Sequence, residues 1–180
     1  MNFSKKVISF ITILLVAIAT VLGILLLSGS KDFWASIIWG IGVIAMIPSF
    51  IYACNGYKKD VAVYYKAFMG LYTLSALITF IADIVNTIAK GTPFVSTIIC
   101  VVVLINYLIL TFAKDFGKQK SMITAFCILG AQLIRFARML IHYNNDNVIF
   151  LSASLNLIVA IVACLFVYAK YQDKTERGAK

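Results

Sequence analysis

Six long apolar runs alternate with short polar connections along this chain, and the alternation organises the whole sequence. Each run covers roughly 20 residues, which is the length that an α-helix needs to cross a hydrocarbon layer of about 30 Å. We therefore predict an all-α fold, a polytopic membrane protein built as a six-transmembrane-helix bundle. The predicted helices cover residues 7–28, 35–54, 66–89, 94–113, 121–142 and 147–169, so residues 1–180 form a single integral membrane domain.

Composition supports the same class of protein. Hydrophobic residues make up 62% of the 180 residues and charged residues only 13%, which lies far from the average of soluble domains. The first run, from Val7 to Leu27, contains no charge and is longer than the apolar core of a secretory signal, which covers about 7–15 residues. We therefore interpret it as a permanent helix of the bundle.

The basic residues predict an orientation for the bundle. Most lysines and arginines fall in alternate connections and at the two ends of the chain, whereas the remaining connections hold only Lys31 and Lys90. By the positive-inside rule, the N- and C-termini are cytoplasmic and the protein is a multi-pass protein of the cell membrane. The net charge of +9 is explained by this orientation and by contact with membrane lipid headgroups, so we expect no nucleic-acid partner.

Three charged residues, Asp83, Arg135 and Arg138, fall inside predicted helices. A charge near mid-bilayer costs at least about 2.5–3.5 kcal/mol, so such residues are normally paired or face a wet cavity. Counted along their helices, all three lie in the outer half of the bundle, and nearby polar residues at intervals of three and four share their helix faces. We predict one ligand-binding site there, formed by Asp83, Asn86, Gln132, Arg135, Arg138, His142 and Asn156.

These residues also have purely structural interpretations. Arg135 either pairs with Asp83 to lock two helices together or faces a ligand, and Arg138 can extend its side chain to the outer headgroups. Two arginines and one aspartate leave one positive charge unneutralised, and this charge favours an anionic ligand group or a lipid phosphate. For Trp39, a few residues inside its helix, lipid contact is favoured over lining a cavity.

No motif indicates a metal, a cofactor or a catalytic residue. His142 is the only histidine, and the four cysteines, Cys54, Cys100, Cys127 and Cys164, are isolated in different apolar runs. Zinc sites use several such ligands, so these cysteines are predicted to be small packing residues. The chain also lacks the sequence signatures of nucleotide binding and of common hydrolases.

Three functions are compatible with these features. The first is the binding or transport of a small anionic or zwitterionic solute through an outward-facing polar site. In size, in its six helices and in its inward termini the chain resembles the substrate-capturing S components of energy-coupling-factor vitamin transporters, and the resemblance implies solute capture. The alternatives are a non-catalytic accessory or immunity-type membrane subunit, in which Asp83 and the arginines pair and a membrane partner subunit is bound, and a lipid-modifying membrane enzyme with Asp83 and His142 as acid and base.

Overall fold

The computed structural model describes residues 5–90, 94–113, 117–141 and 147–177, and the regular structure in these ranges is helical. The elements are α1 (Lys5–Gly29), α2 (Phe33–Cys54), the short 3-10 helix η1 (Lys59–Val61), α3 (Ala62–Lys90), α4 (Phe94–Phe112), α5 (Lys118–Ile141) and α6 (Asn147–Arg177). One long helix therefore corresponds to each predicted apolar run. The last helix continues to Arg177, beyond the predicted end at residue 169.

All six long helices in the described ranges are long and apolar enough to span a membrane. Large apolar side chains also cover the outside of the bundle, with Phe10 69% exposed, Ile88 82% exposed and Phe112 71% exposed. An outer surface of this kind suits contact with lipid and not with water. The structure thus has the form of a multi-pass membrane protein, as predicted.

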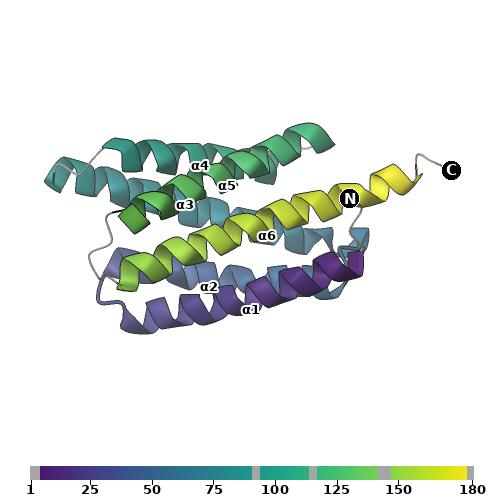
Figure 1. Cartoon of the computed structure of the whole chain (residues 1–180), viewed down its shortest axis with the longest axis horizontal. Coiled ribbons are helices and arrows are strands. Elements are labelled where there is room, and N and C mark those ends of the chain that lie inside the picture. The colour runs from purple at the N-terminus through teal and green to yellow at the C-terminus, as the bar shows by residue number, and fades with distance from the viewer. Residues whose placement is uncertain (1–4, 91–93, 114–116, 142–146, 178–180) are drawn as a thin grey trace.

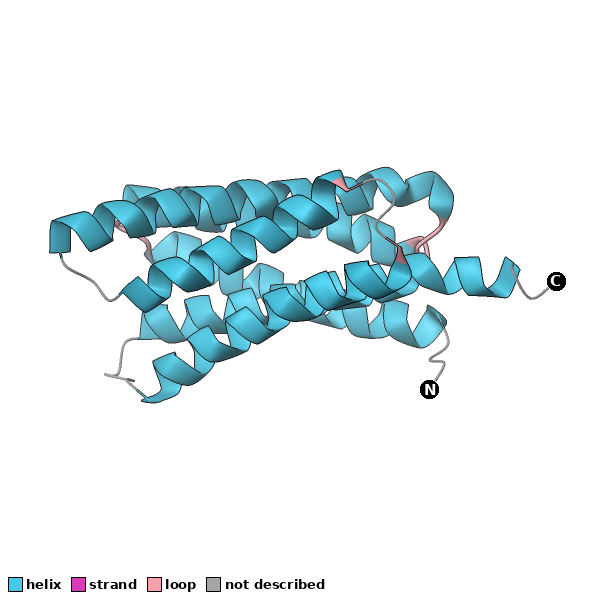
Figure 2. Ribbon diagram, turned by 90° about the horizontal axis from the view of Figure 1, so that it is seen from above, coloured by secondary structure: helices cyan, strands magenta, loops and turns pink. Residues whose placement is uncertain are grey.

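The helices form a closed ring. Each long helix packs against the next one in sequence, and α1 also packs against α6, which closes the circle. Because the helices run alternately up and down and are even in number, both ends of the chain emerge at the same end of the bundle (Figures 1 and 2). In this ring α4 lies between α3 and α5, so side chains of α3 and α5 meet those of α4 first.

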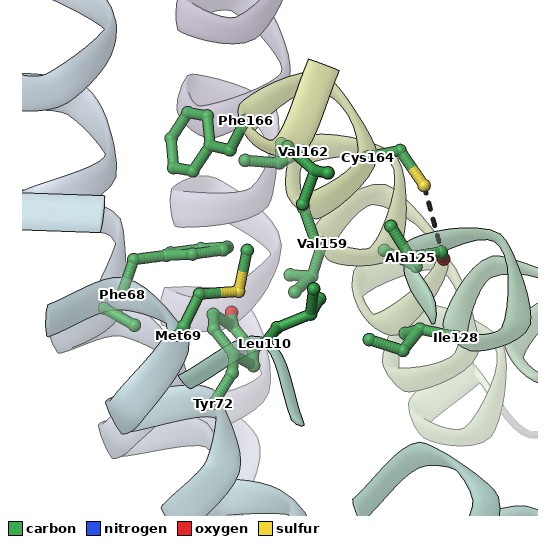
Figure 3. Close-up of a cluster of buried hydrophobic side chains, with 14 of the residues drawn as sticks. Phe68, Met69, Tyr72, Leu110, Ala125, Ile128, Val159, Val162, Cys164 and Phe166 are labelled. Atoms are coloured by element: carbon green, nitrogen blue, oxygen red, sulfur yellow. Dashed lines mark hydrogen bonds between the residues drawn. The ribbon is translucent and has the colours of Figure 1, made fainter. Parts of the chain in front are cut away.

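A group of aromatic side chains fills the interior of the ring in the half that contains the termini. This aromatic plug consists of Tyr52, Tyr57, Phe68, Tyr72, Tyr107 and Phe166. Phe166 is fully buried, with ring centroids 5.1 Å from Tyr52 and 5.0 Å from Phe68. Figure 3 shows Phe68 of α3 and Phe166 of α6 in the buried cluster with Tyr72. Edge-to-face pairs at these separations add to the packing energy, so the plug closes this half of the ring.

The turn after α2 anchors the plug. Gly56 and Tyr57 both adopt positive φ, which is unusual for tyrosine, and the Tyr57 hydroxyl donates a hydrogen bond to Thr12 Oγ1 of α1 at 2.7 Å. Burial raises the pKa of Tyr57 above its ordinary value, so the phenol stays a neutral donor. Ser9 Oγ donates to the Ala53 carbonyl at 2.9 Å, which ties the start of α1 to the end of α2.

Candidate functional site

The end of the ring opposite the termini encloses a cavity of about 810 Å³, which we call the main cavity. Helices α2 to α6 line it, and its wall is mostly apolar with a few polar groups, as is typical of sites for small molecules. Val148 and Ile149, in the first turn of α6, line the cavity and are exposed, so it reaches the surface at this end. The lining residues are Ala35, Ile38, Trp39, Thr79, Ser96, Ile99, Arg135, Arg138, Met139, Val148, Ile149, Ser152, Ala153 and Asn156.

Two guanidinium groups face this cavity. Arg135 and Arg138 lie three residues apart on α5, which places them on one side of the helix. Arg138 forms no hydrogen bond or ion pair with the described residues, and Arg135 Nη2 donates to Cys100 Sγ at 2.9 Å. A thiol is a weak acceptor, and the described lining residues include no aspartate or glutamate. Neither arginine therefore forms an ion pair with a described residue.

Asp83 has its hydrogen-bond partners on α4. Ser96 Oγ donates to Asp83 Oδ1 at 3.0 Å, and Thr97 Oγ1 donates to Asp83 Oδ2 at 2.7 Å. Both hydroxyls belong to the first turn of α4, where the helix dipole also favours a negative charge. Asp83 therefore fastens α3 to the start of α4.

This arrangement bears on an interpretation that the sequence left open. A direct pair between Asp83 and Arg135 was an open alternative, because both residues lie at one depth, but no ion pair joins Asp83 to either arginine among the described residues. The physical reason is the order of the helices, since α4 stands between α3 and α5. The hydroxyls of Ser96 and Thr97 on α4 donate to the Asp83 carboxylate, and the Cys100 thiol on α4 accepts a hydrogen bond from Arg135.

We expect Asp83→Ala to lower the free energy of unfolding by roughly 2 kcal/mol, because it removes two hydrogen bonds to a charged group, at about 1.5–3 kcal/mol each, and in part offsets this loss by removing a charge from within the membrane. Asp83→Asn should cost less, since the amide still offers the Ser96 and Thr97 hydroxyls both an acceptor and a donor. Thermal unfolding of the purified variants measures both effects. Asn86→Ala, an exposed position on the same helix, is the control and should match wild type. An unchanged midpoint for Asp83→Ala would show that this contact does not hold α4.

A second, much smaller cavity of about 20 Å³ adjoins the main cavity, and we call it the inner chamber. The two share Thr79, Arg135 and Asn156, so Arg135 lies at the junction. The stacked rings of Tyr72 and Tyr107, with centroids 5.9 Å apart, belong to both the chamber wall and the aromatic plug. The lining residues of the chamber are Tyr72, Ser75, Ala76, Thr79, Cys100, Val103, Tyr107, Gln132, Arg135 and Asn156.

The structure brings together four of the seven residues predicted for the site. Gln132, Arg135, Arg138 and Asn156 line one or both of the cavities. Asp83 does not line the main cavity but contacts Ser96, which does. Asn86 is exposed and lies outside the lining, because its position on α3 turns it away from the cavity. The prediction for His142 falls outside the described residues.

Some residues of the site were missed or misassigned from sequence. Trp39, for which lipid contact was favoured, lines the main cavity, and Cys100, predicted to be a packing residue, accepts the hydrogen bond of Arg135. The roles of Ser96 and Tyr72 were not predicted. For Tyr72 the available signal was periodicity, because Tyr72, Ser75, Ala76, Thr79 and Asp83 occupy positions i, i+3, i+4, i+7 and i+11 and so share one face of α3.

Comparisons of this chain with protein-family models, with curated proteins and with solved structures found no match. The chemistry of the two cavities is therefore what bears on function.

Proposed function

We propose that this protein binds or transports a small anionic or zwitterionic solute in the main cavity. One observation carries the proposal: among the described residues, Arg135 and Arg138 line the same cavity with no acidic residue beside them, and Arg138 has no partner there. A charge withdrawn from water within a membrane protein needs a counter-charge, and a ligand anion supplies one. Guanidinium groups suit carboxylate or phosphate because they donate two parallel hydrogen bonds.

The remaining wall suits an organic solute. In this proposal the arginines hold the anionic group, and the side chains of Thr79, Ser152 and Asn156 orient it with hydrogen bonds. The apolar part of the wall, which includes Trp39 and Met139, then contacts the carbon body of the solute. A volume of about 810 Å³ lies within the range of about 300–1,000 Å³ that is common for small-molecule sites.

The proposal also includes an orientation in the cell membrane, with cytoplasmic termini and a main cavity that opens to the outside. The basic residues support it, because they gather at the end of the bundle that holds the termini, as with Lys5, Lys66 and Lys118. The cavity lies at the other end, near Lys31. Under the positive-inside rule the end with more lysine and arginine faces the cytoplasm.

The two alternatives find less support in the geometry. An accessory subunit whose intramembrane charges pair with one another requires contact between Asp83 and the arginines, and no such ion pair is formed among the described residues. A lipid-modifying enzyme with Asp83 as its acid requires that carboxylate in the cavity, and Asp83 is not part of the lining.

A thiol-labelling experiment tests the orientation and the binding together. Ser152 lines the main cavity about 7–8 Å along α6 from its start at Asn147. We expect Ser152→Cys to react with a membrane-impermeant maleimide in intact cells, and carboxylates or phosphate esters that bind should slow the reaction. Labelling of the wild-type protein measures the background reaction of the native cysteines. Lys118→Cys, exposed at the opposite end, should react only after permeabilisation. The reverse pattern would contradict the proposed orientation.

A further inference from the structure

Two buried polar atoms of the inner chamber have no hydrogen-bond partner within the described residues. They are the hydroxyl of Tyr72 on α3 and Oε1 of Gln132 on α5, and their residues are only 6% and 5% exposed. Buried polar groups in folded proteins are nearly always hydrogen-bonded, because an unpaired one loses its hydration without compensation. Both residues line the same small cavity, which makes a single occupant the simplest partner for the two atoms.

The size of the chamber limits that occupant to about one heavy atom. A volume of about 20 Å³ exceeds the roughly 10–15 Å³ that a water molecule needs, but it leaves no room for a carboxylate or a phosphate. The chamber also provides enough partners, because Thr79 and Asn156 line it with Tyr72 and Gln132. A buried water usually makes about three hydrogen bonds, so a lining of this polarity suits it.

The charges around the chamber define the chemistry further. Gln132 Oε1 only accepts hydrogen bonds, so the occupant must donate one, and the Tyr72 hydroxyl can then donate to the occupant in turn. A metal cation or an ammonium is disfavoured, because Arg135 lines the same small space with its positive charge. A neutral group that both donates and accepts fits these conditions, and water is the simplest one.

We propose that the inner chamber is a binding site for one ordered water molecule, which bridges the Tyr72 hydroxyl and Gln132 Oε1. The water joins α3 to α5 across the interior of the ring, although these helices are not neighbours in it. It also forms a polar floor for the main cavity, next to Arg135. This inference does not depend on the proposed solute, because the unpaired atoms are properties of the protein alone.

The sign of a stability change tests the proposal. If the Tyr72 hydroxyl holds a water, Tyr72→Phe removes a hydrogen bond, and the unfolding midpoint of the detergent-purified protein should fall by about 2–4 °C. If the hydroxyl is unpaired, its removal relieves the cost of burial, and the midpoint should stay or rise. Tyr65→Phe is the matched control, since Tyr65 is another buried tyrosine of α3 that does not line the chamber.

A double-mutant cycle with Gln132→Met then tests whether the two groups share one water. We expect the double variant to lose less stability than the sum of the two single losses, because either substitution alone already removes the bridge. A midpoint that stays or rises in Tyr72→Phe, or losses that add in full, would overturn the proposal. If Gln132→Met does not fold, the sign of the Tyr72→Phe change still decides.

Discussion

Replacing Arg138 by glutamine is expected to weaken the binding of a carboxylate or phosphate solute by about 10- to 100-fold. A hydrogen bond to a charged group contributes about 1.5–3 kcal/mol, and each 1.4 kcal/mol corresponds to a tenfold change in affinity. Because Arg138 has no partner among the described residues, the substitution should leave the fold intact. Calorimetric titration of the purified protein with an anion that raises its unfolding midpoint measures the effect.

The matched control for this prediction lies on the same helix. Lys118→Gln removes one positive charge at the start of α5, where the side chain is exposed and outside the main cavity. Its affinity for the anion should equal that of wild type, which separates a contact in the cavity from the general effect of net charge. Equal affinities for Arg138→Gln and wild type would remove this arginine from the site.

We expect Phe166→Ala to be among the most destabilising substitutions in the bundle, with a loss of about 3 kcal/mol. Phe→Ala in well-packed cores costs about 3–5 kcal/mol, and the lower end applies here because lipid tails are nearly as apolar as the protein interior. Phe166 is fully buried and its ring contacts Tyr52, Tyr57 and Phe68, so its removal leaves a void at the centre of the aromatic plug. Thermal unfolding in detergent measures the loss.

Phe126→Ala provides the comparison for this effect. Phe126 lies on α5 with 55% of its surface exposed, so the same truncation removes contacts with lipid or detergent and few with protein. Its midpoint should stay near that of wild type. Similar midpoints for Phe166→Ala and Phe126→Ala would show that the plug does not stabilise the ring.

The number and type of the helices could be predicted from the sequence because burial in lipid requires long apolar runs. Helix ends were less predictable. Basic side chains at Lys66, Lys118 and Lys120 marked the predicted limits of two runs, yet α3 begins at Ala62 and α5 at Lys118. A helix continues through such residues because its backbone is satisfied internally and the charged ends of their side chains can extend toward polar surroundings.

For the residues of the candidate site, the depth in the bundle and the helix face could be predicted from the sequence, but the contacts between them could not. Periodicity and residue counts placed Gln132, Arg135 and Asn156 in the same half of the bundle, and the structure has them around the inner chamber. The order of the helices in the ring is a tertiary property, and no residue pattern revealed that α4 separates Asp83 from Arg135. Hydroxyl groups of membrane helices often donate to their own backbone, as Thr111 does to the Tyr107 carbonyl, so no residue pattern indicated that Ser96 and Thr97 donate to Asp83.

The central claim, an anion site in the main cavity, is tested most directly by thermal unfolding against matched ligands. Each carboxylate or phosphate ester is compared with its neutral amide or alcohol and with its cationic amine analogue, on wild type and on the Arg135→Gln, Arg138→Gln double variant. A ligand at 100 times its Kd stabilises the folded state by about 2.7 kcal/mol. We predict that certain anions raise the wild-type midpoint, that their neutral and cationic analogues do not, and that the double variant loses the rise. No rise with any anion, an equal rise with the analogues, or a rise that persists in the double variant would contradict the account.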